Sequence, residues 1–488
     1  MDFLDRILSW GMRAPDRVAH VSATRRMSYG ELVGRAATLA RELATTLPND
    51  RAPVALVGHR EPQLLVGMLG CALANHPYVP IDDALPAPRV ARIQEIARVA
   101  TTLTPDDIDR LAPDGSALPA PLARAGDDRF YIMFTSGSTG EPKGVQVTRG
   151  NLAAFIDWML GEQAFTPGGE VFLNQANFSF DLSVMDTYLS LVTGGTLVSA
   201  TRDHVADLRA LFTLLRETPF TTWVSTPTFA GMCLAEPAFS ASMLPRLRRF
   251  LFCGEVLPRE VARALLARFP SAAVWNTYGP TEATVATTSV RLDHAMVEAN
   301  DALPVGCAMP GTWVEVVDAD GRVVPEGGRG EIVIAGPNVS PGYLGRDDLT
   351  RARFTRRHGH RAYRTGDWGR YRGDQLFCEG RMDQQVKLRG YRIELGEIEA
   401  HLRDVSGVRD AAVVLVVRDG TPHSLVALLL AEDARGDHEA LAREAKAALA
   451  AQLPAYMVPR RLRVVDRFPM TANGKVDRAA LAAEAGAR

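Results

Sequence analysis

Short apolar runs alternate with longer amphipathic segments over roughly the first 300 residues of the chain. Residues 53–57 form one such run and end at a glycine, which is typical of a strand buried on both faces. Residues 28–46 instead repeat apolar side chains at helical spacing, with Ser28 as a plausible N-cap. This alternation predicts an α/β fold with largely parallel sheets flanked by helices. We expect further strands at residues 78–81, 131–134, 223–225 and 249–253, and further helices at residues 64–74 and 258–269.

The pattern changes twice further along the chain. Residues 313–317 and 330–334 look like hairpin strands joined by turns, which predicts a small β-barrel-like subdomain at about 300–382. A glycine-rich, basic stretch then precedes a small α+β segment, with strands expected at residues 411–417 and 424–430 and a helix at residues 437–452. We therefore predict an N-terminal core of residues 1–382 and a mobile C-terminal domain of residues 383–488.

Composition narrows the class of protein. The chain has 488 residues, 47% hydrophobic and 23% charged, and a formal net charge of -2. This balance is that of a soluble globular protein, and it gives no electrostatic reason to expect a nucleic-acid partner or membrane insertion. No apolar stretch reaches the length of a membrane span, and no signal peptide is evident. The five cysteines contain no CxxC pair, and we interpret them as buried free thiols of a cytoplasmic protein.

The segment of residues 131–145 carries the strongest chemical signal. An apolar strand runs into a loop rich in glycine and hydroxyl side chains, which can bring backbone and side-chain donors to phosphate oxygens. Lys143 would add a compact positive charge. The pattern GxxxxGK[ST] is absent, so this is no P-loop, and a flexible surface loop is the structural alternative. The candidate phosphate-binding residues are Thr135, Ser136, Gly137, Ser138, Thr139 and Lys143.

This loop resembles the signature of the adenylate-forming superfamily, which includes acyl-CoA synthetases, luciferases and amino-acid adenylation domains. Further blocks follow in the superfamily's order, so the resemblance covers nearly the whole chain. These blocks are residues 276–282 (Asn-Thr-Tyr-Gly-Pro-Thr-Glu), 330–331 (Gly-Glu), 363–367 (Tyr-Arg-Thr-Gly-Asp), 380–383 (Gly-Arg-Met-Asp), 387–394 (Lys-Leu-Arg-Gly-Tyr-Arg-Ile-Glu) and 473–475 (Asn-Gly-Lys).

The resemblance implies an ATP site. Tyr278 would stack on adenine, Thr281 would donate to the α-phosphate, and Glu282 would help to hold Mg²⁺. Asp367 would accept hydrogen bonds from the ribose hydroxyls. Without the resemblance, Thr281 could be a helix N-cap and Asp367 a turn residue. The remaining residues that we assign to the nucleotide are Asn276, Thr277, Gly279 and Arg381.

The resemblance also implies a reaction in two steps. A carboxylate attacks the α-phosphorus of MgATP and forms an acyl-adenylate, and a thiol then forms a thioester and releases AMP. Lys475 matches the catalytic lysine, which would stabilise the charge that develops as pyrophosphate leaves. Asp383 matches the hinge about which the C-terminal domain rotates, and Gly390 would line the path of a pantetheine arm.

Asp181 indicates which acid is activated. In amino-acid-activating members of the superfamily this position pairs with the substrate's α-ammonium group, and fatty-acid or aryl-acid enzymes do not need the charge. A helix N-cap is the structural alternative. The matching pocket wall is mostly apolar and uncharged, which favours a small side chain such as that of alanine. Its residues are Leu182, Met185, Thr228, Leu251, Cys253, Thr277, Val285 and Ala286.

Residues 179–186, 252–258, 276–286 and 454–459 resemble the corresponding segments of D-alanine–carrier protein ligases, and Cys253 matches the cysteine that senses stereochemistry in that subgroup. No carrier domain follows Lys475 in the sequence, so we expect a discrete carrier protein with a phosphopantetheine arm as acceptor. The alternatives are a stand-alone natural-product enzyme that loads L-alanine, serine or glycine onto a carrier or a carrier-bound aminoacyl group, an acyl-CoA ligase, and a non-catalytic binding protein.

Overall fold

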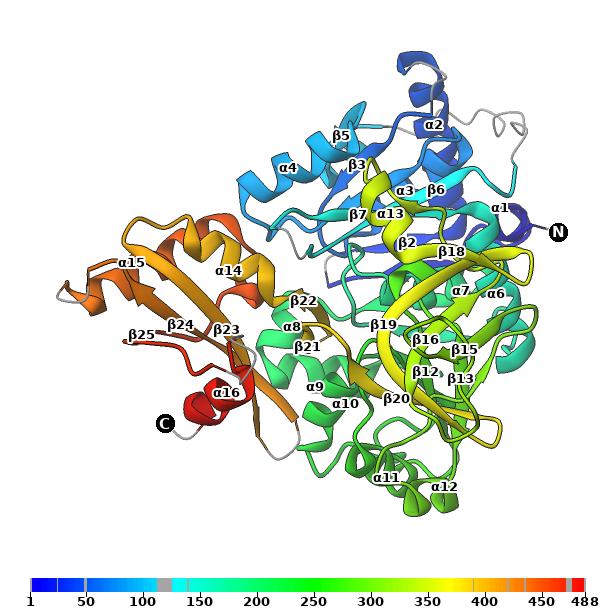
Figure 1. Cartoon of the computed structure of the whole chain (residues 1–488). Helices are drawn as coiled ribbons and strands as arrows, with labels where there is room; N and C mark the ends of the chain where they lie inside the picture. The colour runs from blue at the N-terminus through cyan, green and yellow to red at the C-terminus, as the bar shows by residue number, and fades with distance from the viewer. Residues whose placement is uncertain are drawn as a thin grey trace. The chain divides into compact units, whose positions relative to one another are not determined.

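The computed structural model describes residues 2–23, 25–47, 51–111, 125–137, 140–388, 390–418, 421–433, 436–470 and 476–486. These residues divide into two compact units, which we describe separately (Figure 1). The first unit contains Met1–Asp83, Ile96–Met133 and Gly144–Gly380. The second contains Ala84–Glu95, Phe134–Lys143 and Arg381–Arg488.

The largest sheet of the first unit has nine strands within the described ranges, in the order β14-β13-β12-β11-β10-β8-β9-β1-β2. The five adjacent pairs from β12 to β1 are parallel, and the strands at the two ends are antiparallel to their neighbours. The strands are β1 (Val18–Val21), β2 (Arg26–Ser28), β8 (Val171–Asn174), β9 (Thr196–Ser199), β10 (Thr222–Ser225), β11 (Arg249–Phe252), β12 (Ala273–Tyr278), β13 (Thr288–Leu292) and β14 (Cys307–Ala308).

A second sheet follows the order β17-β7-β6-β4-β3-β5, with β5, β3, β4 and β6 parallel. It consists of β3 (Val54–Val57), β4 (Tyr78–Ile81), β5 (Thr101–Leu103), β6 (Arg129–Thr135), β7 (Lys143–Thr148) and β17 (Gly342–Tyr343). All four residues of β4 are buried, as expected for a parallel strand covered on both faces. The sequence prediction of α/β architecture with parallel-rich sheets is therefore confirmed.

A third sheet is antiparallel and follows the order β15-β16-β19-β18, with β20 paired to β19. Its strands are β15 (Trp313–Val317), β16 (Gly330–Ala335), β18 (Phe354–Arg357), β19 (His360–Arg372) and β20 (Gln375–Arg381). The predicted hairpin strands at residues 313–317 and 330–334 pair with each other, which confirms that prediction.

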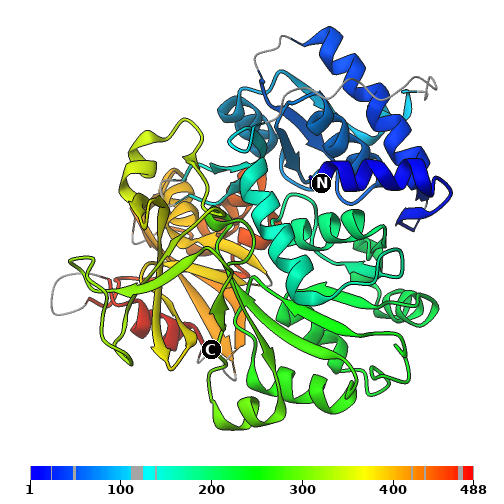
Figure 2. The same cartoon turned by 90° about the vertical axis from the view of Figure 1, so that its right-hand side faces the viewer.

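Helix α2 begins where the sequence predicts, because the Ser28 side chain accepts a hydrogen bond from the backbone of Glu31. Helix α7 is buried along its whole length, packs on β8, β9 and β10, and is flanked by α1 and α6 (Figure 2). The helices of this unit are α1 (Phe3–Arg13), α2 (Tyr29–Thr46), α3 (Pro62–Leu73), α5 (Pro105–Asp109), α6 (Arg149–Gln163), α7 (Leu182–Thr193), α8 (Arg202–Ala206), α9 (Leu208–Glu217), α10 (Pro227–Leu234), α11 (Arg259–Arg268), the 3₁₀ turn η1 (Thr281–Ala283), α12 (His294–Ala299) and α13 (Asp347–Arg353).

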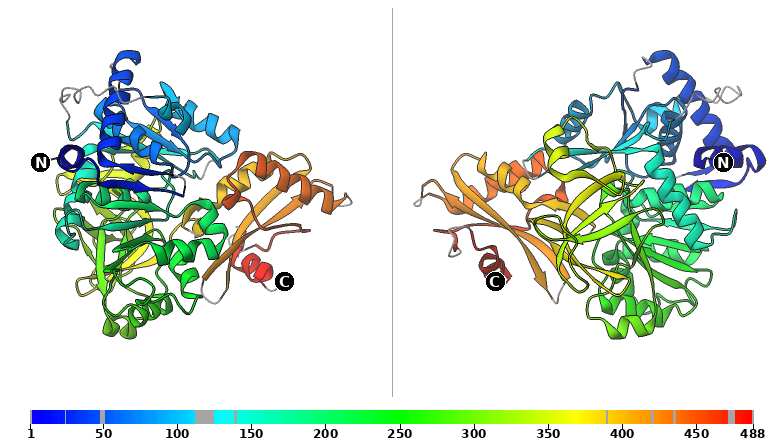
Figure 3. Two further views of the ribbon diagram at one scale, coloured as in Figure 1. Left: turned by 180° about the vertical axis from the view of Figure 1, so that it is seen from behind. Right: turned by 45° about the vertical axis from the view of Figure 1, so that its right-hand side comes forward.

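The second unit is built on a sheet in the order β23-β24-β25. Alternate residues of β23 face opposite sides, so Ala411 and Val413 pack with α14 and α15 while Ala412 and Val414 pack with α16 (Figure 3). Its elements are α4 (Ala87–Ala97, which extends into the first unit), β21 (Gln385–Leu388), β22 (Tyr391–Glu394), α14 (Leu395–Arg403), β23 (Val408–Arg418), β24 (Thr421–Ala431), α15 (His438–Gln452), η2 (Ala455–Met457), β25 (Arg461–Val464) and α16 (Arg478–Gly486).

The cysteines correct one expectation. All five are free thiols, but only Cys71, Cys233 and Cys253 are buried, whereas Cys307 is exposed and Cys378 is half-buried. Cys307 is exposed because it lies in β14, the edge strand of the nine-stranded sheet, which has a neighbour on one side only. No helix in the described part of the chain has both the length and the apolar character required to cross a bilayer.

Candidate active site

Most residues of the predicted pocket wall belong to one apolar cluster of the first unit. Side chains of β11 alternate, so Phe250 and Phe252 join the cluster on the side of α9 to α12, while Leu251 joins the cluster around α7. This cluster extends from α1 to β20, and it contains seven predicted site residues that are distant in sequence. They are Leu182, Met185, Leu251, Cys253, Tyr278, Val285 and Ala286.

Thr228 differs from the other members of the predicted wall, which are buried. Its side chain is exposed, and its backbone N–H donates to Glu255 Oε2 at 3.0 Å. Thr277, the remaining member of the predicted wall, is buried, and its hydroxyl group donates to the Phe252 carbonyl at 2.8 Å.

Asp181 is the residue immediately before α7, and it is 8% exposed. It occupies the N-cap position but makes no side-chain capping hydrogen bond, which argues against the structural alternative. Its Oδ2 instead accepts a hydrogen bond of 2.6 Å from the hydroxyl of Thr281. Burial, and then the negative charge of Asp181, raise the pKa of the neighbouring Tyr131 well above its ordinary value. A buried carboxylate therefore lies at the start of α7, the helix that carries the wall residues Leu182 and Met185.

Tyr131 is a residue that the sequence interpretation placed in a strand and gave no role. It is fully buried, and its hydroxyl finds no hydrogen-bond partner among the described residues. A buried donor of this kind is costly unless a ligand or a water satisfies it. No sequence signal distinguished it from the other apolar positions of β6.

Cys253 and Val285 lie in direct contact. The thiol of Cys253 donates to the Val285 carbonyl oxygen at 3.3 Å, and both side chains are almost fully buried. This contact joins the end of β11 to the loop that follows η1. It also holds the thiol in one orientation at the pocket wall.

The loop after η1 has an unusual backbone. Thr284 and Val285 both adopt left-handed conformations, with φ of 56° and 67°, which is a strained region for a β-branched residue. Asn338 stabilises this loop, because its amide nitrogen donates to the Ala283 carbonyl and to the Thr287 hydroxyl, each at 2.9 Å. The Thr284 hydroxyl in turn donates to the Asn338 carbonyl at 2.7 Å. Sequence reasoning missed Asn338.

Glu282 is fully buried on η1. Tyr343 donates to its Oε1 at 2.7 Å, and the Ser340 N–H donates to its backbone carbonyl. Sequence reasoning missed Tyr343 as well. The N-cap of η1 is Pro280, so the alternative interpretation of Thr281 as that cap is wrong.

Tyr278 and Asp367, the residues predicted to bind adenine and ribose, lie together. The Tyr278 hydroxyl donates to Asp367 Oδ2 at 2.6 Å, and the Thr365 hydroxyl accepts from the Asp367 N–H at 3.0 Å. Burial, and then the charge of Asp367, raise the pKa of Tyr278 well above its ordinary value. Tyr278 is therefore neutral and able to donate across the physiological pH range.

Two further predicted nucleotide residues border this pair. Asn276 is buried, and its amide nitrogen donates to the Pro304 carbonyl at 2.7 Å. A Cβ atom at Gly279 would lie 2.6 Å from the Cα of Ala286, so the close approach of these two backbone segments requires glycine.

The predicted phosphate loop belongs to the second unit. The Thr135 hydroxyl is buried without a hydrogen-bond partner in the described part of the chain, whereas the Ser136 hydroxyl donates to the Arg392 carbonyl at 2.8 Å. The Gly137 N–H donates to Glu397 at 3.1 Å, and Lys143 pairs with Glu394 at 3.2 Å. Ser138 and Thr139 lie outside the described residues.

Arg381 and Asp383 form a two-point ion pair, with N–O distances of 2.9 and 2.5 Å. The predicted nucleotide-binding guanidinium and the predicted hinge carboxylate are thus bonded to each other. Gly390 has a left-handed backbone with φ of 85°, which favours glycine. Lys475, the predicted catalytic lysine, lies outside the described residues.

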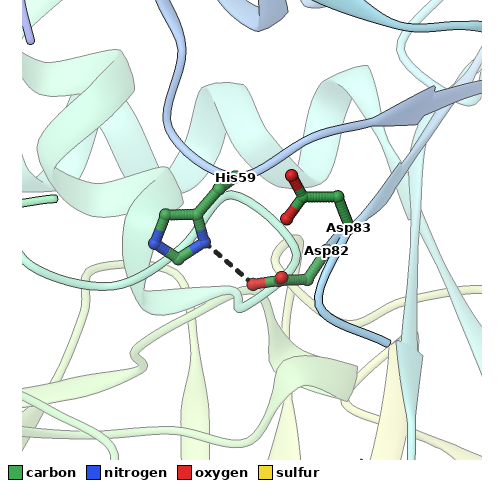
Figure 4. Close-up of side chains that lie close together, drawn as sticks. All are labelled: His59, Asp82 and Asp83. Carbon is green, nitrogen blue, oxygen red and sulfur yellow. Dashed lines mark hydrogen bonds and ion pairs between the residues drawn. The ribbon is translucent and has the colours of Figure 1, made fainter. Parts of the chain in front are cut away.

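One group of three side chains in the described part of the chain could hold a metal ion, namely His59, Asp82 and Asp83 (Figure 4). His59 Nδ1 lies 3.0 Å from Asp82 Oδ2, and Arg202 bonds to both aspartates. Because the guanidinium group already compensates the carboxylates, we assign this group as an ion-pair network.

Two models of known protein families match the chain. A family model described as AMP-binding enzyme matches residues 9–344, and one described as AMP-binding enzyme C-terminal domain matches residues 397–475. The chain belongs to the AMP-binding enzyme family. The predicted membership of the adenylate-forming superfamily is thereby confirmed.

Individual relatives narrow the comparison. The chain is 43% identical over 506 aligned positions to a D-alanine–D-alanyl carrier protein ligase of Bacillus thuringiensis (strain Al Hakam), with 99% of each chain covered. A protein of the same name from Bacillus anthracis (strain CDC 684 / NRRL 3495) is 43% identical over 505 positions, again with 99% of each chain covered.

Among solved structures, the Vibrio cholerae adenylation domain AlmE, in complex with glycyl-adenosine-5'-phosphate, has a TM-score of 0.88 and 23% identity, and covers 100% of this chain and 98% of its own. Holo-PA1221, a nonribosomal peptide synthetase protein containing adenylation and PCP domains, has a TM-score of 0.85 and 29% identity, and covers 98% and 84%.

Proposed function

We propose that the protein is an AMP-forming ligase that activates alanine, in the D form, and transfers it to the phosphopantetheine thiol of a discrete carrier protein. The observation that carries this proposal is the buried carboxylate of Asp181 at the start of α7, the helix that carries Leu182 and Met185 of the predicted wall. A buried carboxylate favours a cationic ligand group, and the wall of Met185, Leu251 and Val285 favours a small apolar one. Alanine combines an ammonium group with a methyl side chain.

The full-length relatives support the D form and the carrier as acceptor, because the name they carry states both. The likeness to the glycyl-adenylate complex is at 23% identity and supports the fold alone. L-Alanine, glycine and serine are therefore the alternative substrates that an experiment must include. We also propose a cytoplasmic location, which the free state of the five cysteines supports.

In the first step, the alanine carboxylate attacks the α-phosphorus of ATP and pyrophosphate leaves. Asp181 holds the ammonium group, Thr281 donates to the α-phosphate, and Asp367 accepts from the ribose hydroxyls. Asn276, Thr277 and Gly279 border the nucleotide beside Tyr278, and Thr228 completes the amino-acid pocket. Thr135 to Thr139 and Lys143 bind the phosphates. The expected catalytic group is Lys475, which stabilises the departing charge.

A magnesium ion fits this site on chemical grounds. Its preferred ligands are carboxylate and phosphate oxygens, and Glu282 offers a buried carboxylate that Tyr343 orients. Together with phosphate oxygens of ATP, Glu282 would hold the ion, which neutralises phosphate charge when it is bound.

In the second step, the carrier thiol attacks the aminoacyl carbonyl, and AMP leaves as the thioester forms. We propose that the segment from residue 383 onward is a mobile domain that rotates between the two steps, with Asp383 as its hinge. Breaking the Arg381–Asp383 ion pair would free Arg381 for the ribose or the phosphates. Gly390 then leaves room for the pantetheine arm.

The test is pyrophosphate exchange with D-alanine, L-alanine, glycine and serine. We expect exchange with D-alanine to exceed the others, and to be lost in Asp181→Asn and Lys475→Ala but not in the surface control Asp157→Asn. Lys475→Arg keeps the charge and should still impair exchange, whereas Lys446→Arg, on helix α15, should be silent. Equal exchange with acetate or fatty acids, insensitive to Asp181→Asn, would contradict the proposal.

A further inference from the structure

The hydrogen bond between Thr281 and Asp181 joins two subsites that the proposed function keeps apart. Asp181 precedes α7 and is assigned to the amino acid, whereas Thr281 begins η1 and is assigned to the nucleotide. Their side-chain oxygens are 2.6 Å apart, within the range of charge-assisted O–H···O⁻ hydrogen bonds. Both residues are more than nine-tenths buried, since Thr281 is 7% and Asp181 8% exposed. Water therefore competes weakly for either group.

The hydroxyl of Thr281 has one proton and can donate one strong hydrogen bond at a time. In this structure the Thr281 hydroxyl donates this proton to Asp181. The proposed function requires the same proton at the α-phosphate of ATP. The two hydrogen bonds therefore exclude each other.

The surrounding loop allows the exchange to occur by rotation of the hydroxyl group alone. Asn338 donates hydrogen bonds to the Ala283 carbonyl and to the Thr287 hydroxyl. Glu282 accepts one hydrogen bond at its backbone carbonyl from Ser340 and another at its side chain from Tyr343. A hydroxyl hydrogen rotates about its C–O bond without any backbone movement. The backbone of η1 can remain fixed while the hydrogen bond changes partner.

We propose that Thr281 couples the amino-acid and nucleotide subsites, and this inference rests on the proposed function. When ATP takes the Thr281 hydrogen bond, Asp181 is left buried with one donor fewer, and its affinity for an ammonium group rises. By thermodynamic reciprocity, a bound amino acid that satisfies Asp181 releases Thr281 for the α-phosphate. Each ligand thereby raises the affinity of the enzyme for the other.

Hydrogen bonds to charged groups and typical couplings between sites both suggest that one ligand changes the affinity for the other by roughly ten- to a hundredfold. Alanine binding is measured by calorimetric titration of the full chain, with and without a non-hydrolysable methylene analogue of ATP and Mg²⁺. In the wild type we expect the analogue to tighten alanine binding by that factor. Thr281→Val has the same shape but no hydroxyl, so the ratio of the two dissociation constants should fall to about one. Alanine should bind to that variant without nucleotide about as tightly as to the wild type with nucleotide.

Two further variants distinguish a specific loss of coupling between the subsites from general damage to the protein. Thr281→Ser restores the hydroxyl and should restore the ratio. Thr196→Val removes a hydroxyl that donates to the Val18 carbonyl, and it should leave the ratio at the wild-type value. A wild-type ratio in Thr281→Val, a ratio of one in the wild type, or no rescue by serine would overturn the coupling while leaving the proposed function intact. If the wild type binds neither enantiomer of alanine, nor glycine or serine, with or without nucleotide, the proposed function fails and the coupling fails with it.

Discussion

The hydroxyl group of Tyr278 donates a hydrogen bond of 2.6 Å to Oδ2 of Asp367, and both residues are buried. The aromatic ring expected to stack on adenine therefore also orients the carboxylate expected to bind ribose. Under the proposed function, this phenol and this carboxylate would form one preorganised surface for the nucleoside. Tyr278 lies at the end of β12 and Asp367 within β19, and these two strands belong to different sheets.

Tyr278→Phe should weaken ATP binding with little effect on alanine. The substitution keeps the ring for stacking but removes the donor to Asp367, so the carboxylate loses its fixed orientation. We expect the KM for ATP in pyrophosphate exchange to rise by roughly ten- to a hundredfold, since hydrogen bonds to charged groups contribute about 1.5–3 kcal/mol. Tyr371→Phe is the matched control, because Tyr371 donates to the Val314 carbonyl instead. An unchanged KM for ATP in Tyr278→Phe would contradict this role.

Much of the fold could be predicted from local pattern. The helix that begins after Ser28 and the strands at residues 54–57 and 78–81 follow from spacing and capping alone. These features depend on neighbours a few residues apart, which a sequence displays directly.

The contacts that organise the site could not be predicted in the same way. Thr281 and Asp181 are 100 positions apart, and Tyr278 and Asp367 are 89 positions apart. Family resemblance named these four residues but not their pairing. Asn338 and Tyr343 belong to no recognisable sequence motif. Their contacts with η1 and the loop that follows it depend on where the chain after β16 passes in space. Exposure of Cys307 depends likewise on strand order, which composition does not reveal.

Asn338→Ala should damage both stability and the site. The change removes two donated hydrogen bonds and leaves the Ala283 carbonyl and the Thr287 hydroxyl without this donor in a buried loop. Each such loss typically costs about 1–3 kcal/mol, so we expect the unfolding free energy to fall by roughly 2–4 kcal/mol. Because η1 and the loop that follows it carry Thr281, Glu282 and Val285, KM should rise for both ATP and alanine. Chemical denaturation and exchange kinetics measure the two effects.

The control for that variant is Asn300→Ala, which removes a half-buried amide that donates to the Met296 carbonyl at the end of α12. We expect a small loss of stability and no change in either KM. If Asn338→Ala lowers stability but leaves both KM values at the wild-type level, Asn338 supports the fold without positioning the site.

Cys253→Ala should lower the selectivity of the enzyme for D-alanine over L-alanine. The thiol is held at the pocket wall by its hydrogen bond to the Val285 carbonyl, and alanine at this position leaves space where the sulfur lay. Differences of one small group in a pocket are worth about 1–3 kcal/mol, so the ratio of kcat/KM for D- and L-alanine should fall by about tenfold or more. Cys233→Ala also removes a buried thiol, but from the cluster on the other side of the sheet, and should leave the ratio unchanged. A constant ratio in Cys253→Ala would exclude a role for the thiol in discrimination.

His20 should make the protein less stable in mild acid. It is fully buried against Ser199, and desolvation by burial lowers its pKa from 6.5 to about 3. The folded state therefore keeps this imidazole neutral, while the unfolded chain binds a proton once the pH falls below about 6.5, so stability decreases from there down to about pH 3. One such group changes the unfolding free energy by about 1.4 kcal/mol per pH unit. His20→Gln cannot take up this proton, so its unfolding free energy, measured by denaturant titration between pH 7 and 5, should depend less steeply on pH. The exposed His294→Gln should retain the wild-type slope, and an equal slope in all three proteins would show that His20 is not the group responsible.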